Sequence, residues 1–293
     1  MASNQHPLHG GAPNEKLWPR NKHHLKVRFL NGDDWQKNLV RYVVWKYYHE
    51  IPMRIGFEFL KTGTPGPSDI RVEFSTESRS YIGRDAEAHP EETTLWLNLN
   101  NNIGDDRERR LQWQADILHE FGHAPGTEHE HSHPDCKLSW NYRVLQGRTG
   151  WDATRVHYNY DKIYSANAKL APYDPESIIH YCVYEGDTPG MGTTIPLNTT
   201  LLDGDKKFLV AIYPVEKPKP PTDLVQPRKR KFDEKPEKYR REMIRLEQNW
   251  NRHHDHGYGV TMSESTMIGG SNNNCNVVSV NSGSGAFIGI NSW

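Results

Sequence analysis

Residues 119–131 read HEFGHAPGTEHEH, and their types and spacing suit a hydrolytic metal site. His119 and His123 are four residues apart, so on a helix their imidazoles lie on one face and can bind the same cation. Glu120 points to a neighbouring face, where its carboxylate can reach a metal-bound water without being a ligand. The pattern therefore predicts a catalytic zinc ion with Glu120 as the general base.

A third ligand must come from chain that turns back after this helix. Gly126 permits such a turn, and His129 follows three residues later. Three neutral imidazoles leave a fourth position open for water, which is typical of catalytic zinc and not of structural zinc. His131 is an alternative third ligand at a less familiar distance from the glycine. The alternative without metal is a surface helix end that carries solvated histidines.

The segment HEFGHAPGTEH resembles the HExxHxxGxxH signature of the metzincin zinc endopeptidases, and the following Glu130 is similar to the astacin branch. Three other segments extend the resemblance: LWPRNKHHLKVRFLNG (17–32) to the opening strand, YDPESIIHY (173–181) to the Met-turn, and LLDGDKKFLVAIYP (201–214) to the closing helix. The resemblance covers about residues 17–216.

The resemblance implies an enzyme that hydrolyses peptide bonds in protein or peptide substrates with one zinc ion. Tyr181 would be a fifth ligand at rest or a hydrogen-bond donor to the oxyanion, and the alternative is an aromatic ring packed at the cleft floor. The strand around Trp96–Leu99 resembles the cleft-edge strand that pairs with an extended peptide. A zinc-bearing pseudoprotease that only binds peptides is the rival function.

Two residues depart from the family pattern. Ile179 stands where the family has a methionine beneath the metal, and an isoleucine can also supply an apolar floor. Pro125 stands where most relatives carry a helix former, and proline removes a hydrogen bond to the carbonyl of Phe121. We therefore expect the helix to end early or to kink.

Regular hydrophobic patterns before residue 130 predict the elements that position these residues. Alternating apolar residues predict four strands, in LKVRFL, IGFEF, IRVEF and TLWLNL. Helical spacing predicts one helix over about 34–49 and a second from 105 or 106 toward 126. The expected fold is α+β and metzincin-like, with a twisted, mostly parallel sheet, two long helices above an active-site cleft and a loop-rich lower subdomain.

Composition divides the chain into three regions. Residues 1–16 are expected to be a flexible arm, 17–216 the zinc peptidase domain, and 217–293 a proline-rich, basic and low-complexity tail. The tail contains RKRK at 228–231 and HHDH at 253–256, which are more often solvated charge than sites for nucleic acid or metal.

Bulk properties exclude some partners. The net charge of −1 and the lack of a recognition motif disfavour a nucleic-acid-associated protein, and no apolar run approaches the roughly 20 residues of a membrane span. The N-terminus lacks an apolar stretch, which favours a cytoplasmic protein, although the resembled family is mostly secreted. Three cysteines favour a reduced chain, with a Cys136–Cys182 bridge as the alternative.

Overall fold

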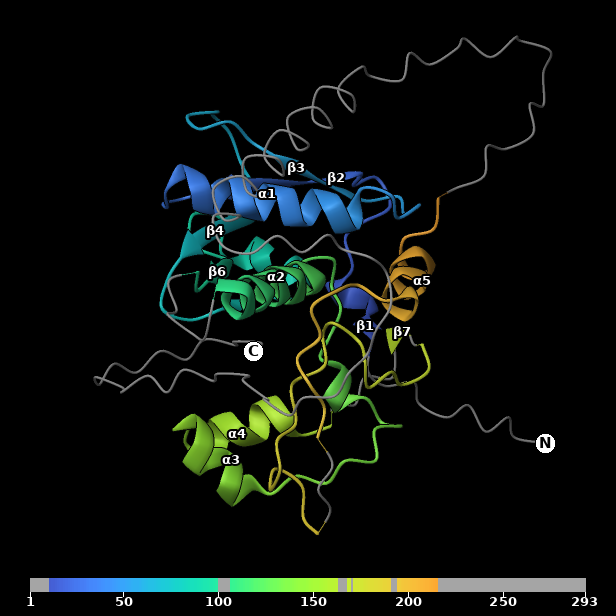
Figure 1. Cartoon of the computed structure of the whole chain (residues 1–293). Helices are drawn as coiled ribbons and strands as arrows, with labels where there is room; N and C mark the ends of the chain where they lie inside the picture. Colours follow the sequence, from blue (N-terminus) through green and yellow to red (C-terminus); the bar gives the residue numbers. More distant parts are fainter. Residues whose placement is uncertain (1–10, 100–105, 163–167, 170, 191–193, 216–293) are drawn as a thin grey trace, which may run out of the picture.

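The computed structural model describes residues 11–99, 106–162, 168–169, 171–190 and 194–215 (Figure 1). A five-stranded sheet with the order β3-β2-β4-β6-β5 forms its upper part. The strands are β2 (His24–Phe29), β3 (Gly56–Phe59), β4 (Ile70–Phe74), β5 (Arg79–Ser80) and β6 (Leu95–Leu97). All neighbouring pairs are parallel except β5 with β6. The α+β class with a mostly parallel sheet is therefore confirmed.

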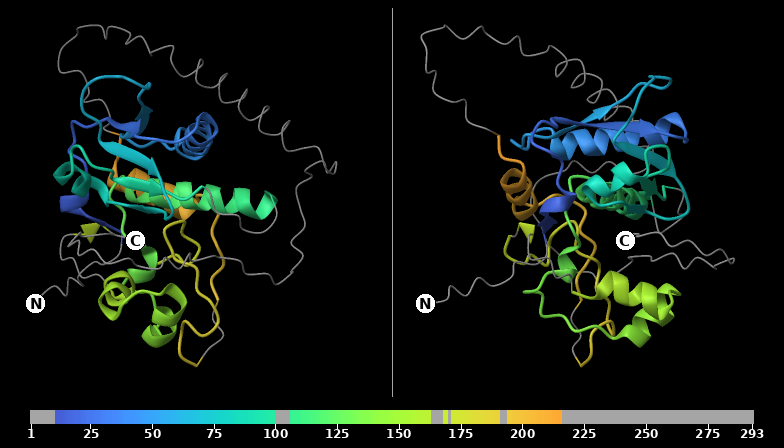
Figure 2. Two further views of the ribbon diagram at one scale, coloured as in Figure 1. Left: turned by 90° about the vertical axis from the view of Figure 1, so that its left-hand side faces the viewer. Right: turned by 180° about the vertical axis from the view of Figure 1, so that it is seen from behind.

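Two helices lie side by side on one face of this sheet, as Figures 1 and 2 show. Helix α1 (Asp34–Tyr48) begins with a capping box between Asp33 and Gln36. Helix α2 (Asp106–His123) follows the connection after β6. The apolar faces of both helices and of the sheet form one core, which includes Val27, Val40, Val43, Val72, Leu95, Ile117, Leu118 and Phe121. This core fixes α2 and with it the predicted histidine pair.

The edge of the sheet differs from the expectation. Strand β6 lies between β4 and β5, so the prediction that the strand around Trp96–Leu99 forms the edge is wrong. Strand β5 holds the edge and runs antiparallel, with Arg79 opposite Trp96. A two-residue strand has no hydrophobic period, which is why the sequence pattern did not reveal it.

The lower part, residues 130–200, contains two short helices that the sequence did not predict. Helix α3 (Tyr142–Thr149) begins at Asn141, whose side chain accepts a hydrogen bond from the backbone of Val144. Helix α4 (Ala153–Tyr160) begins at Asp152 with the same kind of cap. The helices enclose a small separate core of Trp140, Leu145, Val156, Tyr160 and Val183. The remaining lower part is irregular, as expected.

Helix α5 (Asp203–Ile212) closes the described chain and packs on the upper core. The residue after it, Tyr213, donates its hydroxyl to the carbonyl of Pro125 and accepts from the backbone of Trp18 at 3.0 Å. The Trp18 indole donates to the carbonyl of Ala124 at 2.8 Å. We call Trp18 and Tyr213 the end clamp, because together they satisfy carbonyls at the end of α2 that would otherwise be unpaired.

The beginning of the described chain also packs on the fold. Strand β1 (Ala12–Pro13) pairs with β7 (Ala168–Lys169), and Gly11 accepts a hydrogen bond from the backbone of Glu128 at 2.6 Å. Residues 1–10 and the expected tail at 217–293 lie outside the described residues.

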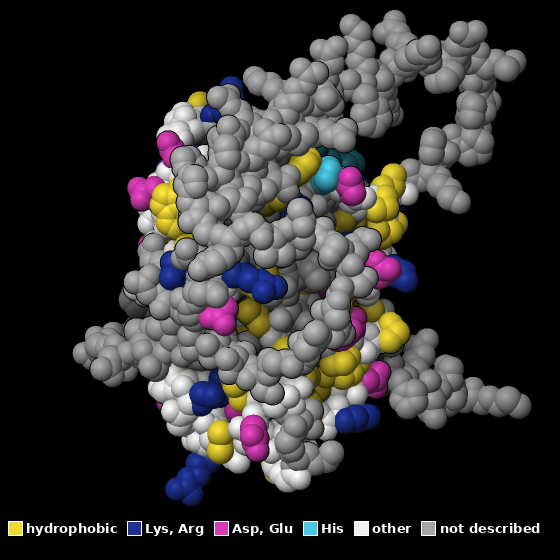
Figure 3. Space-filling view, in the orientation of Figure 1, with side chains coloured by type: hydrophobic (Ala, Val, Ile, Leu, Met, Phe, Trp, Pro, Cys, Tyr) yellow, Lys and Arg dark blue, Asp and Glu magenta, His cyan; other side chains and the backbone are white. Residues whose placement is uncertain are grey.

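The helices and the surface of the fold have two further features. None of the described helices combines the length and apolar composition that a membrane span requires. Acidic and basic side chains are interspersed on the face drawn in Figure 3.

Cys136 is free and buried, so the alternative Cys136–Cys182 bridge is not formed. Cys182 is nevertheless disulfide-bonded, and the expectation of a fully reduced chain is wrong for this cysteine.

Candidate metal centre

Three histidines meet at one point beneath the end of α2. The Nε2 atom of His123 lies 3.2 Å from Nε2 of His119 and 3.1 Å from Nε2 of His129. One donor atom from each ring lies within 4.8 Å of the others, and this is the only such group among the described residues. The predicted spacing on the helix and the predicted return of the chain thus bring the three rings together.

Backbone carbonyls fix how two of these rings are turned. Nδ1 of His119 donates to the carbonyl of Ile178 at 2.8 Å, and Nδ1 of His123 donates to that of Thr127 at 2.7 Å. Each bond places the proton on Nδ1 and leaves the lone pair on Nε2, directed toward the other histidines. Lone pairs at this separation repel one another, and a shared cation removes the repulsion. The donor set therefore fits a zinc ion with nitrogen ligands.

Burial keeps the three imidazoles neutral, as metal binding requires. It lowers the pKa of His119 to about 4 and that of His123 to about 3, and the neighbouring His119 adds to the second effect. The pKa of His129 is also well below its ordinary value, first because of burial and then because of His123. All three nitrogens are thus available as ligands at neutral pH.

The turn between the second and third histidine is tightly held. Helix α2 ends at His123, two residues before Pro125, as the proline predicted. Gly126 follows with φ +108°, a conformation that favours glycine, and its backbone donates to the carbonyl of His123 at 2.8 Å. The hydroxyl of Thr127 donates to the carbonyl of Gly122 at 2.6 Å. These bonds and the end clamp set the position from which His129 reaches the other rings.

Glu120 is buried next to the first histidine, with 5% of its surface exposed. Its Oε2 atom has no hydrogen-bond partner among the described residues. Burial raises the pKa of this carboxyl well above its ordinary value, and the nearby Asp116 adds to the rise. A buried carboxyl oxygen without a partner is costly to the fold, so its place beside a metal centre indicates a chemical role.

Tyr181 lies beside the three histidines, although it belongs to a later segment of the chain. Its ring centroid is 4.4 Å from that of His129 and 5.8 Å from that of His119. Burial raises the pKa of its phenol well above the ordinary value, so the hydroxyl keeps its proton at neutral pH. A protonated hydroxyl at this place can donate a hydrogen bond to a bound oxygen atom.

Ile179 forms an apolar layer beneath α2. Its side chain is 5% exposed, and a Cβ atom added to Gly122 would come within 2.8 Å of its Cγ2 atom. Its carbonyl accepts from the backbone of Glu130 at 3.2 Å. The isoleucine therefore packs directly against the helix turn that carries two of the histidines.

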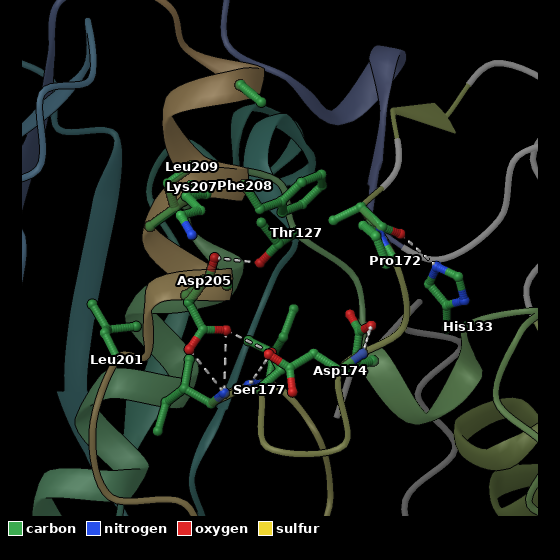
Figure 4. A pocket seen from close by; sticks show the side chains of 18 of the residues that line it. Thr127, His133, Pro172, Asp174, Ser177, Leu201, Asp205, Lys207, Phe208 and Leu209 are labelled. Carbon is green, nitrogen blue, oxygen red and sulfur yellow. Dashed lines mark hydrogen bonds between the residues drawn. The ribbon is translucent and has the colours of Figure 1, made fainter.

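A cavity of about 440 Å³ lies behind this layer (Figure 4). On its wall, Asp205 accepts hydrogen bonds from the hydroxyl of Ser177 at 2.7 Å and from the backbone of Ile178 at 3.3 Å. The carbonyl of the same Ile178 holds His119. Helix α5 thus supports the first histidine through the backbone of one residue, Ile178. The carbonyl that holds His119 could not be predicted from the sequence, because a backbone carbonyl is the same in every residue.

Charged residues connect the sheet edge with the lower part. Glu77, just before β5, lies 3.9 Å from the guanidinium of Arg155 on α4 and 3.1 Å from that of Arg79. The Arg79 guanidinium lies 3.8 Å from the centre of the Trp96 ring. These contacts hold α4 beneath the sheet edge, on the side of the molecule where the histidines lie.

His131, the alternative third ligand, lies outside the group of three. It is fully buried, and its Nε2 donates to the carbonyl of Asn159 on α4 at 2.7 Å. One ring nitrogen is therefore engaged by the lower part and not by the other histidines.

Fold and site together define a class: the chain resembles the astacin-type metzincin zinc metalloproteases in its α+β architecture and in its HExxHxxGxxH histidine group. A structure of myroilysin aligns with 71% of this chain and 100% of its own, with 26% identity and a TM-score of 0.61. A second myroilysin structure aligns with 73% of this chain and 98% of its own, at 24% identity and a TM-score of 0.51, and supports the fold alone.

Comparison of the sequence with known proteins gives a match over a smaller part of the chain than comparison of the structure does. No protein-family model matches the chain. Nematocyst expressed protein 6 of Nematostella vectensis is 35% identical over 71 residues, which is 24% of this chain and 24% of that protein. The chain thus matches about a quarter of the length of this curated relative. The likeness to the class rests on the structure and on the motif.

Proposed function

We propose that this chain is a zinc-dependent endopeptidase in which His119, His123 and His129 hold one catalytic zinc ion and Glu120 is the general base. The observation that supports this best is the meeting of three Nε2 atoms, two of them on buried histidines, beside a buried carboxyl whose Oε2 has no hydrogen-bond partner among the described residues. A bound zinc ion supplies Lewis-acid chemistry, since it polarises a carbonyl and lowers the pKa of water. The proposed catalytic unit lies within residues 17–216.

Glu120 moves the proton in this proposal. Its carboxylate takes a proton from the attacking water and passes it to the nitrogen of the leaving amine. The Oε2 atom of Glu120 has no hydrogen-bond partner among the described residues, so it can receive this proton and hold it between the two steps. Tyr181 acts as donor to the oxyanion with its protonated hydroxyl, which stabilises the charge that develops on the scissile carbonyl oxygen.

The substrate is a protein or peptide in an extended conformation. Strand β5 is the last strand of the described sheet, so its outer side can form backbone hydrogen bonds with an added strand. Main-chain pairing of this kind is independent of side-chain identity and suits an enzyme that accepts many sequences. A strand added there would lie near Glu77, Arg79 and Arg155, whose ion pairs lie at this edge.

The test combines metal analysis with a peptidase assay on a casein-like substrate. The protein reconstituted with zinc should contain one ion per chain and cleave, and a strong chelator should remove both properties. Glu120→Gln should keep the zinc and lose about 10²–10⁴-fold in turnover, because the shape is kept and the base is lost. Glu108→Gln, an exposed position on the same helix, is the matched control and should cleave normally.

Two results would contradict the proposal. Reconstituted protein without stoichiometric metal would exclude the histidine site. Stoichiometric zinc without any turnover would instead indicate the rival function, a zinc-bearing module that binds peptides.

A further inference from the structure

His131 is a buried histidine that the proposed zinc site does not use. Its side chain is fully buried, and its ring lies nearly parallel to the ring of Tyr181, with centroids 4.2 Å apart and an interplanar angle of 25°. The stacking of His131 on Tyr181 is closer than the contact of Tyr181 with His129. The ring that covers the face of Tyr181 thus belongs to a residue outside the metal group.

The lower part holds His131 in a single orientation. Its Nε2 atom donates to the carbonyl of Asn159 at 2.7 Å, near the end of α4. Trp140 meets the imidazole edge-on at a centroid distance of 5.8 Å and an angle of 88°, and Tyr160 lies at 5.4 Å. A half turn of the imidazole would break the bond to Asn159. The imidazole of His131 is therefore held in a fixed orientation by its contacts with α4.

Tyr181 is held by aromatic contacts from several directions. His129 is tilted against it at 58° and Tyr160 meets it at 64°, with centroid distances of 4.4 and 5.6 Å. Ring contacts of this kind fix the plane of a phenol, and because the O–H bond prefers to lie in the ring plane, the plane limits the directions in which the hydroxyl can donate. A donor to an oxyanion is effective only within a narrow range of position, so this plane matters for turnover.

We propose that His131 is a positioning residue, which stacks on Tyr181 and holds its hydroxyl toward the three-histidine site while anchored to α4 through Asn159. The proposal rests on the proposed function, since it concerns the oxyanion donor of that reaction. It replaces the alternative of His131 as a zinc ligand with a role that acts through another side chain. The Nδ1 atom of His131 has no hydrogen-bond partner among the described residues, so the ring face is what carries this role.

The kinetic test is a double-mutant cycle with Tyr181→Phe. His131→Leu removes the flat ring and should lower kcat about tenfold, with KM and zinc content unchanged, because loss of the stacking misplaces the hydrogen-bond donor and not the substrate. In the Tyr181→Phe background the same change should have no further effect on kcat, since the donor is already gone. An equal loss in both backgrounds, or loss of zinc in His131→Leu, would overturn the proposal.

Two variants guard against a merely structural explanation. His131→Phe keeps a flat ring and should recover most of the kcat that His131→Leu loses, although it leaves the Asn159 carbonyl unpaired. If the phenylalanine variant folds and is as slow as the leucine variant, stacking is not the cause. His133→Leu is the matched control, because His133 is equally buried but contacts Tyr173 and the Ala171 carbonyl. It should leave kcat unchanged.

A measurement without turnover separates this proposal from the proposed function. In protein with isotope-labelled tyrosine, the NMR signal of Tyr181 is the one that disappears in Tyr181→Phe. Its ring-flip rate should rise in His131→Leu and stay as in the wild type in His133→Leu. An unchanged flip rate would contradict the proposal even in an active enzyme. A faster flip in a protein that does not cleave would support the stacking and contradict only the peptidase function.

Discussion

The upper and lower parts of the molecule contribute to the same site by different physical means. The upper part has long elements with periodic apolar faces, and one large core positions His119, Glu120 and His123 on α2. The lower part has two eight-residue helices and a small core, and individual polar and aromatic contacts position His131 and Tyr181. Repeated apolar contacts determine the structure of the upper part, and individual polar and aromatic contacts determine that of the lower part.

Such a division has a consequence for how each half tolerates substitution. A large core distributes the loss of one side chain over many neighbours, whereas in the ion pair of Arg148 with Asp187 one side chain supplies the whole charge compensation that the described residues show. The following changes test whether the two halves differ in this way.

The largest expected effects come from matched leucine truncations. Leu118 in the upper core and Leu145 in the lower core are both fully buried. Each change to alanine should cost about 2–5 kcal/mol of local stability through lost burial and a cavity. Leu118→Ala should lower the global free energy of unfolding in urea. Leu145→Ala should mainly speed amide exchange in α3 and α4, and equal acceleration in α1 would show that the two cores unfold as one.

A single ion pair should matter nearly as much in the lower part. Arg148 donates to both carboxylate oxygens of Asp187 at 3.0 and 2.8 Å, and the Asp187 side chain is 1% exposed. Arg148→Gln leaves that carboxylate buried without its cation, which costs roughly 3 kcal/mol. Amide exchange of α3 measures the loss, with the exposed Arg143→Gln as control. Equal stability of the two variants would contradict the role of the pair.

A buried carboxyl in the upper part should give a pH dependence. Asp116 accepts from Gln112 at 2.8 Å and from Ser78 at 3.2 Å, and burial raises its pKa to about 6. The unfolded chain loses this proton near pH 4, so the folded state binds more protons between about pH 4 and 6 and stability falls as pH rises there. Asp116→Asn should make this slope in thermal unfolding shallower by the share of one proton, because the buried carboxyls of Glu128 and Glu130 also have raised pKa values. A wild-type slope that persists unchanged in the variant would contradict the assignment.

The smallest effect is expected at the apolar layer beneath α2. Ile179→Met exchanges two apolar side chains of similar volume, which usually costs less than about 1.5 kcal/mol. Zinc content and unfolding of the variant measure the effect. Loss of zinc would mean that the packing of Ile179 against Gly122 sets the histidine geometry much more strictly than an apolar floor requires.

The same division explains what could be predicted from the sequence. The strand at Ile70–Phe74 and both long helices were predicted, because apolar residues recur there at a regular interval over several turns or alternations. Helices α3 and α4 were missed, because eight residues with scattered aromatics show too little periodicity. Strand β5 was missed for the same reason.

The site divides in a similar way. The spacing of His119, His123 and His129 is a local property of the chain, and the structure brings these rings together. The carbonyl of Ile178 and the anchor at Asn159 come from distant segments and are backbone atoms, so no residue type marks them. The reactive side chains could be identified from the sequence, but the backbone carbonyls that orient them could not.

The end clamp has a consequence for how the site comes into being during synthesis. The helix that carries His119 and His123 leaves the ribosome early. The carbonyl of Pro125 can accept its hydrogen bond from Tyr213 only after that residue has been synthesised, 88 residues later. A nascent chain that stops short of α5 has the two helical histidines without the contact that secures the turn toward His129. The turn toward His129 is therefore secured only after α5 and Tyr213 have been made, so the three-histidine group depends on a segment that is synthesised much later than its own residues.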